Sequence, residues 1–145
     1  MKLYHGTNAA YLDDILAHGL RPRGKGNKNS NWDHTVKSRA GYVYLTSSYG
    51  FYFANSAVSD ATEKGMVLEI ELTEEDLLKL YPDEDFIAQA QDMNERNKNV
   101  VPSESLNDRT RRIKLDEFQQ SWPLSLKHLG NVSHKGVIPA SRIKR

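Results

Sequence analysis

Apolar and polar positions near the N-terminus follow the spacing of one amphipathic helix. Leu12, Ile15 and Leu16 fall on one helical face, and the acids between them fall outside it. The side chain of Asn8 is expected to cap the first turn by accepting an otherwise unpaired backbone N–H. Gly19, a residue that tolerates positive φ, is expected to end the helix. The pattern therefore predicts a short capped helix between Asn8 and Gly19.

The rest of the hydropathy pattern predicts alternating strands and helices. Strands are expected over residues 3–5, 41–45, 66–72 and 131–138, because these segments are β-branched, aromatic or alternately apolar and polar. Helices are expected over residues 49–61, 73–80, 82–94 and 118–129. Two polar stretches, residues 23–38 and 94–107, are expected to be a functional or disordered loop and a mobile segment. The chain is predicted to form one mixed α+β domain over residues 1–145.

Composition limits the chemistry that the chain can support. Its 145 residues fit one domain, and the absence of cysteine excludes a disulfide framework, a thiolate metal site and a cysteine nucleophile. The five histidines show no metal-ligand spacing, so we expect no metal site. No apolar run has the length of a signal peptide or a membrane span. We expect a cytoplasmic protein without a membrane partner.

Charge is balanced overall but uneven along the chain. The formal net charge is +1, yet residues 21–39 carry six basic side chains against one acid, Asp33. A second basic cluster spans residues 109–114, and acids gather between Glu63 and Glu95. A basic patch on a near-neutral protein can steer a polyanion. The same pattern also fits a loop that its charges merely keep solvated.

Three motifs, taken in order, resemble the ADP-ribosyltransferase superfamily, which includes bacterial toxins, poly- and mono-ADP-ribose polymerases, DarT-type DNA-modifying toxins and RNA 2′-phosphotransferases. The motifs are the segment 3–7 with the helix and residues 19–22 after it, Arg39 followed by residues 42–48, and residues 136–143. The resemblance implies an ADP-ribosyltransferase-like split mixed β-sheet with flanking helices. It also implies that NAD is the co-substrate and that ADP-ribose is transferred to a macromolecular acceptor.

The first motif contains His5, Gly6 and Thr7 behind a short strand. By resemblance, His5 hydrogen-bonds the adenosine ribose, while Gly6 lets the backbone approach the nicotinamide amide and Thr7 lies beside them. A glycine suits that role because any side chain would block a close approach. His5 can alternatively be a half-buried strand-end histidine that the backbone satisfies.

The second motif supplies rings and hydroxyls. By resemblance, Tyr44, Tyr49 and Tyr52 are candidates to sandwich the nicotinamide ring, and Thr46 and Ser47 offer hydroxyls beside the ribose. The tyrosines can alternatively belong to the core and the sheet edges. Arg39 lies where a phosphate-binding arginine precedes the strand in RNA 2′-phosphotransferases, and its guanidinium suits a pyrophosphate. An ordinary surface arginine fits that position equally well.

The chain departs from the family where many members place a catalytic glutamate. The strand segment 131–136 contains no acid. Asn131 or Ser133 could instead hold the ribose by hydrogen bonding, and Glu117 or Gln120 could approach from the preceding helix. The cluster 83–85 could supply a carboxylate through Glu84, although acids at a helix start also serve as caps. The catalytic candidates are therefore Tyr44, Asn131 and Glu84.

The acceptor and the biological role follow from the resemblance and the loop composition. The segment 21–39 is rich in basic and amide side chains, with Trp32 available for stacking, which favours a nucleic-acid acceptor over a protein one. Small stand-alone domains of this type are often toxins or phage-conflict effectors, so an antitoxin or immunity protein is a possible partner. Two alternatives stay open: an RNA 2′-phosphotransferase, and a non-catalytic module that binds NAD, ADP-ribose or a partner protein.

Overall fold

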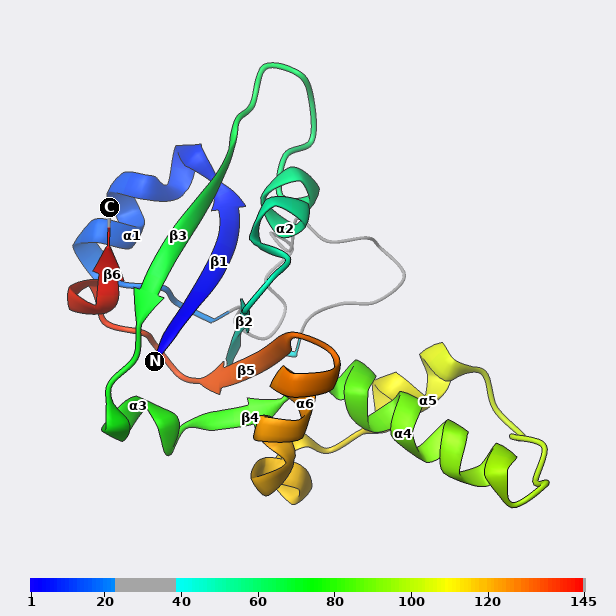
Figure 1. Cartoon of the computed structure of the whole chain (residues 1–145). Helices are drawn as coiled ribbons and strands as arrows, with labels where there is room; N and C mark the ends of the chain where they lie inside the picture. The colour runs from blue at the N-terminus through cyan, green and yellow to red at the C-terminus, as the bar shows by residue number, and fades with distance from the viewer. Residues whose placement is uncertain (23–38, 145) are drawn as a thin grey trace.

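The computed structural model describes residues 1–22 and 39–144 (Figure 1). Within these residues six strands form one sheet in the order β4-β5-β2-β1-β3-β6. The strands are β1 (Lys2–Asn8), β2 (Tyr42–Thr46), β3 (Gly65–Glu71), β4 (Leu80–Pro82), β5 (Asn131–Lys135) and β6 (Ile143–Lys144). The predicted α+β class is confirmed. The predicted mixed sheet is wrong, because each pair of neighbouring strands in this sheet runs antiparallel and none is joined by a parallel crossover.

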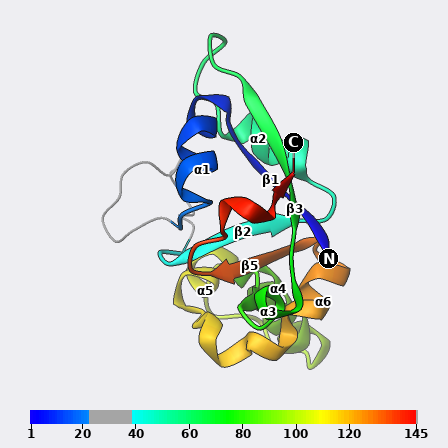
Figure 2. The ribbon, with the colours of Figure 1, turned by 90° about the vertical axis from the view of Figure 1, so that its left-hand side faces the viewer.

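The sheet consists of two halves that meet at one residue pair. In one half β1 pairs with β3 over the whole of β1, and in the other β2 pairs with β5 over all of β2. Between the halves, β1 and β2 share the single register pair Tyr4–Thr46. Figures 1 and 2 show the consequence: β1 and β3 run in a different direction from β5 and β4. The halves therefore diverge on one side of that pair.

The two faces of β2 belong to different environments. Val43 and Leu45 lie in the main hydrophobic core, whereas Tyr42, Tyr44 and Thr46 point to the opposite face. The main core is closed by α1 on β1 and β3, and its buried side chains are Leu3, Ile15, Leu20, Val43, Leu45, Leu68, Ile70, Leu72, Leu80, Val132 and Ile138. A second, smaller cluster of Ile87, Ala88, Ile113 and Leu115 packs against the opposite face.

The N-terminal helix forms as the pattern predicted. Asn8 accepts a hydrogen bond from the Ala10 N–H at 2.9 Å and caps a short 3₁₀ turn, η1 (Ala9–Tyr11), which continues into α1. Gly19 ends α1 with φ of 78°. The helices are α1 (Leu12–His18), α2 (Gly50–Ser56), α3 (Glu74–Leu77), α4 (Glu84–Asn97), α5 (Leu106–Arg112) and α6 (Trp122–His128), with 3₁₀ helices η1, η2 (Leu115–Ser121) and η3 (Ala140–Arg142). None of the described helices has the length and apolarity needed to cross a bilayer.

Helices α4 and α5 pack on each other and form an arm that projects from the body (Figure 1). Arg109 of α5 is buried and pairs with Glu95 of α4 at 2.7 Å. Arg112 pairs with Glu104, and Arg111 lies 3.4 Å from Asp108. The basic cluster seen in the sequence is therefore matched by acids and stabilises the arm, so it does not form a free cationic patch.

Two expected loops compare differently with the fold. The stretch 94–107, expected to be mobile, includes the end of α4 at Asn97 and the start of α5 at Leu106, and residues 98–105 between them form no helix or strand. The α5 helix was missed because its pattern is almost wholly polar and its stability comes from the pairing with α4. The expected loop 23–38, including Trp32, lies outside the described residues.

Candidate functional site

The strands β1 and β2 part immediately after Tyr4, at the histidine singled out in the sequence. If the register continued, Gly6 would face Tyr44, but those residues form no ladder pair. Instead the His5 ring bonds the backbone carbonyl of Tyr44 through Nδ1 at 2.9 Å. A carbonyl only accepts, so Nδ1 carries the proton, and burial lowers the pKa of His5 against that bond. His5 is thus a neutral imidazole whose Nε2 is an acceptor without a partner among the described residues.

Gly6 is required by the packing of α2. A Cβ built on Gly6 would lie 2.3 Å from the Ala54 nitrogen, 2.6 Å from the Gly50 oxygen and 2.7 Å from the Phe53 carbonyl carbon. These are backbone atoms of α2, so a side chain would displace the helix. The glycine therefore brings α2 directly onto β1, beside the open edge of the strand. Thr7 follows as a buried residue opposite Met66 of β3.

One row of residues crosses three strands at the point of divergence. Tyr4 pairs with Thr46 and Thr46 pairs with Asn131, so the three side chains share one face of the sheet. The Thr46 hydroxyl donates to the Gly130 carbonyl at 3.0 Å and accepts from the Ser48 and Tyr49 N–H groups, which uses its whole capacity. The Oδ1 atom of Asn131, by contrast, is buried without a hydrogen-bond partner among the described residues. It is an acceptor that a ligand could satisfy.

Hydroxyl groups and an aromatic ring gather beside Asn131. The Ser47 N–H donates to the Gly130 carbonyl at 2.9 Å, and the Ser47 and Ser48 hydroxyls lie 3.2 Å apart on the surface. The ring of Tyr49 covers Gly130, where a Cβ would lie 3.1 Å from its Cε2 atom. Tyr49 is one of the three rings proposed from the sequence, but its contact with Gly130 spans 81 positions and no local pattern indicated it. Tyr52, another of the three, lies farther along α2 and is exposed.

Tyr44 and Glu84, two of the three catalytic candidates, are hydrogen-bonded to each other. The Tyr44 hydroxyl donates to Glu84 Oε2 at 2.6 Å and accepts from the Arg39 N–H at 3.1 Å. The Tyr44 hydroxyl therefore both donates and accepts a hydrogen bond within the protein. Because Glu84 begins α4 directly after β4, its carboxylate reaches the same sheet face as Tyr44 and Asn131.

The acids around Glu84 are held at raised pKa values. Burial raises the pKa of Asp83 well above its usual range, and the charges of Glu84 and Asp85 add to the shift. Burial also raises the pKa of Glu84, against the stabilising hydrogen bond from Tyr44. Asp83 accepts the Asp85 N–H at 2.8 Å, so the capping interpretation is correct for this residue. Glu84 is the member of the cluster that bonds a side chain of the sheet.

A serine that the sequence did not single out fixes this corner. Ser125 is fully buried, accepts the Asp83 N–H at 3.0 Å and donates to the Asn131 carbonyl at 2.7 Å. It therefore ties the start of α4 to the start of β5. Ser133, a candidate to hold ribose, instead donates to the Pro82 carbonyl at 2.9 Å.

Arg39 is engaged by the arm. Its guanidinium donates to the carbonyls of Thr110, Arg111 at 2.7 Å and Ile113 at 3.0 Å. These carbonyls lie at the C-terminal end of α5, where intrahelical partners run out, although the Thr110 carbonyl also accepts the Ile113 N–H, so Arg39 acts as a long-range cap. Its Nε is buried without a partner among the described residues, and both terminal nitrogens are in use. This geometry does not favour the predicted contact with a pyrophosphate.

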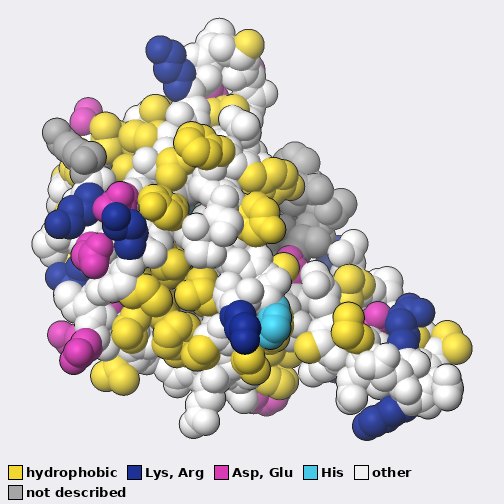
Figure 3. Space-filling model, in the orientation of Figure 1, with side chains coloured by type: hydrophobic (Ala, Val, Ile, Leu, Met, Phe, Trp, Pro, Cys, Tyr) yellow, Lys and Arg dark blue, Asp and Glu magenta, His cyan; other side chains and the backbone are white. Residues whose placement is uncertain are grey.

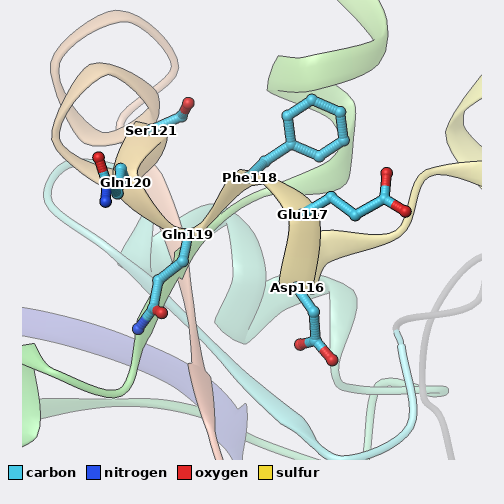
Figure 4. A pocket seen from close by; sticks show the side chains of 6 residues that line it. All are labelled: Asp116, Glu117, Phe118, Gln119, Gln120 and Ser121. Atoms are coloured by element: carbon cyan, nitrogen blue, oxygen red, sulfur yellow. The ribbon is translucent and has the colours of Figure 1, made fainter.

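The remaining alternatives for the missing glutamate lie at the other end of β2. Glu117 and Gln120 line a depression of about 350 Å³ along η2, shown in Figure 4. Its residue Asp116 bonds the Tyr42 hydroxyl at 2.6 Å. Four residues of strand, about 13 Å, separate Tyr42 from Thr46 and Asn131. Glu117 and Gln120 are therefore not part of the site at Asn131.

The structure places most of these candidates near the Tyr4–Thr46 pair, but on two faces of the sheet. Tyr44, Asn131 and Thr46 share one face, where Tyr44 bonds Glu84 and Thr46 is used for internal bonding. His5 lies opposite the core residue Leu68 and reaches β2 through the Tyr44 carbonyl. In the described ranges, no three His, Asp or Glu side chains lie close enough to hold a metal ion. Comparison of the chain with protein-family models, with curated proteins and with solved structures finds no significant match.

Proposed function

We propose that this protein is an NAD-dependent mono-ADP-ribosyltransferase that modifies a macromolecular acceptor. The observation that carries the proposal is the parting of β1 and β2 after the Tyr4–Thr46 pair, with His5 bound to the Tyr44 carbonyl. This arrangement leaves the edge of β1 at Gly6 unpaired with β2. It also places that edge directly against α2. Beyond the Tyr4–Thr46 pair, Ser47 and Ser48 follow β2, and the unpartnered Asn131 begins β5 beside Thr46.

The residues at the divergence suit a bent dinucleotide. His5 Nε2 is a neutral acceptor for a ribose hydroxyl, because its Nδ1 proton is held by the Tyr44 carbonyl. The Asn131 amide can accept a hydroxyl or carboxamide N–H at its buried Oδ1. Tyr49 presents a ring that is half exposed and fixed against Gly130, which suits stacking on a planar ring. Arg39 is not included, since its donors bind α5.

In the proposed reaction, the C–N glycosidic bond of NAD would break and neutral nicotinamide would leave. The acceptor would form a bond to the same ribose carbon and give up its proton. The chain must stabilise positive charge at that carbon and receive the proton. Glu84 is the carboxylate that bonds Tyr44, a residue on the same sheet face as Asn131, and Ser125 ties its neighbour Asp83 to the Asn131 carbonyl. We assign it the electrostatic role, with Asn131 orienting the ribose and Tyr44 holding the carboxylate in place.

The absence of an acid on β5 favours two other functions. An RNA 2′-phosphotransferase begins with attack of a phosphate on NAD and does not need that carboxylate. A non-catalytic module would bind NAD or ADP-ribose through the same His5 and Asn131 contacts. Asn131, an amide with an unpartnered Oδ1 on a strand that carries no acid, is the observation that supports both alternatives.

One set of incubations separates the three functions. Purified protein is mixed with labelled NAD and with RNA, DNA or cell lysate, and nicotinamide release and labelled acceptor are measured. The transferase predicts both products, and their loss in His5→Ala. The matched control is His18→Ala, an exposed histidine at the end of α1. If neither product forms with any acceptor, the transferase proposal fails.

The same samples identify the alternatives. Release of ADP-ribose cyclic phosphate from a 2′-phosphorylated oligonucleotide would establish the phosphotransferase. Tight calorimetric binding of NAD without nicotinamide release over hours would establish the binding module. Both outcomes would keep the site at His5 and Asn131 and change only its chemistry.

A further inference from the structure

A row of exposed aromatic side chains begins next to the candidate site. Phe51 is 82 % exposed, Tyr52 is 64 % exposed and Tyr49 is 51 % exposed, all within four consecutive positions. The opposite side of α2 is committed to packing, because Ala54 is buried and Gly50 lies against Val67 and Tyr4. The rings are therefore held outward by a helix that is fixed on the sheet. Surface hydrophobics scattered singly are common, but a fixed cluster of rings indicates a contact surface.

The end of α6 adjoins this row and supplies positive charge. Gly130, just after α6, receives hydrogen bonds from Ser47 and lies under the ring of Tyr49. Lys127 and His128 occupy the last turn of α6 and are exposed. The ring of His128 also stacks on Phe86, with centroids 6.3 Å apart and planes within 4°. Figure 3 shows hydrophobic side chains over α2 and, below them over α6, a histidine next to a cationic side chain.

The composition of this surface distinguishes it from the other apolar patch. Neither α2 nor α6 contains an acidic residue, and the segment that links β2 to α2 offers only hydroxyls and a tyrosine. The apolar side chains exposed on the arm are aliphatic and not aromatic, and Val101, for example, is 86 % exposed. They lie among the ion pairs of α4 and α5. Rings that stack on bases and cations that meet phosphates are the combination that single-stranded nucleic acid requires.

We infer that the face made by Tyr49, Phe51 and Tyr52 of the α2 region and by Lys127 and His128 of α6 binds single-stranded nucleic acid, which crosses the candidate site at Asn131. The bases stack on the rings and the backbone phosphates approach Lys127. That the bound strand is the acceptor rests on the proposed transferase function, whereas the binding itself does not. The two parts can therefore fail separately.

The test measures the binding of fluorescently labelled 12-nucleotide DNA and RNA strands by anisotropy across a range of salt concentrations. Phe51→Ala and Tyr49→Ala are expected to raise Kd about fivefold or more each, as removal of a stacking ring does. Lys127→Glu is expected to raise Kd and to reduce the slope of log K against log salt by about 0.7. The matched controls, Val101→Ala and Lys98→Glu on the arm, are expected to leave Kd within about twofold, and their exposed positions preserve the fold.

Each result decides part of the inference. Loss of affinity for the strands in the α2 and α6 variants alone supports the surface. Parallel loss of label on nucleic acid in Phe51→Ala and Lys127→Glu, with an unchanged Kd for NAD, supports its role in acceptor binding. Equal loss in the arm controls would overturn it. So would a wild-type protein that binds no strand, or that labels a protein and no nucleic acid, and either result would leave the transferase intact. Strand binding without any consumption of NAD would keep the surface and remove the proposed function.

Discussion

The contact between Gly6 and α2 gives the sharpest structural prediction. In Gly6→Ala the new methyl carbon would lie 2.3 to 2.7 Å from three backbone atoms of α2. Favourable contacts between such atoms lie near 3.5 Å or beyond, so the helix must withdraw by about 1 Å. Backbone atoms cannot rotate away as the end of a side chain can. The cost therefore falls on the packing of α2 against both β1 and β3.

Overpacking of this kind costs about 1–3 kcal/mol, and we expect the upper end, about 3 kcal/mol. For a domain of this length that corresponds to a melting temperature about 6–12 °C lower. The assay is urea denaturation followed by circular dichroism, with a thermal scan on the same samples. A second consequence is that Tyr49 and Tyr52 shift with α2, so the affinity for NAD should fall as well.

The matched control is Gly41→Ala. Gly41 has φ of 88°, but among the described residues no atom beyond its chain neighbours lies within 4 Å of its Cβ position, so the backbone conformation is the penalty expected there. We expect a cost of about 1–2 kcal/mol for a left-handed alanine. A loss of stability in Gly6→Ala no larger than in Gly41→Ala would refute the packing account.

Three further predictions concern buried polar groups. Arg39→Ala removes the cap from the carbonyls at the end of α5 and should lower the free energy of unfolding in urea by about 3 kcal/mol. Arg39→Lys should not restore that stability, because lysine lacks the planar fork of the guanidinium. Full rescue by lysine would contradict the capping role. Asp83 has a raised pKa in the folded state, so its contribution to stability is present below the unfolded pKa and is lost as the pH rises through the folded value. Asp83→Asn keeps the side-chain cap of α4 and removes the titrating group. At pH 8 its unfolding free energy should therefore exceed that of the wild type, and the difference should shrink toward pH 4. A difference that does not depend on pH would count against the raised pKa of Asp83. His134 is buried, and desolvation lowers its pKa, so the stability it contributes is present above pH 6.5 and falls as the pH drops through 6.5 toward the folded value. Non-titrating His134→Leu should show a shallower loss of unfolding free energy between pH 7 and pH 5, and an unchanged slope would exclude the histidine as the cause.

Local signals predicted much of the fold. The Asn8 cap and the Gly19 stop were correct because both act within one or two residues of themselves. The strand at 41–45 and the alternating strand at 66–72 were also found at nearly the right bounds. The short β4 strand was missed, because Leu80 and Pro82 were absorbed into the predicted helices on either side and only Tyr81 was left between them. Strands this short are defined by their partner, here β5, and not by their own pattern.

The site was predictable only in part. The sequence identified His5, Gly6 and Asn131, but their arrangement around the Tyr4–Thr46 pair depends on β1 leaving β2 after a single pair, which no local pattern encodes. Arg39 was assigned to phosphate because a guanidinium matches many partners, and its actual carbonyl partners lie more than 70 positions away. Buried Ser125 carried no sequence signal, since an isolated serine in an apolar helix resembles a surface position.

The most direct test of the account is an NMR titration of the isotope-labelled protein with NAD. If NAD binds where β1 and β2 part, the backbone amides of residues 5–7, 47–49 and 131 should shift together along one binding curve. Amides of residues 116–121 in η2 and 98–106 in the arm should stay unchanged. Shifts confined to η2 or the arm, or no shifts at millimolar NAD, would contradict the central claim.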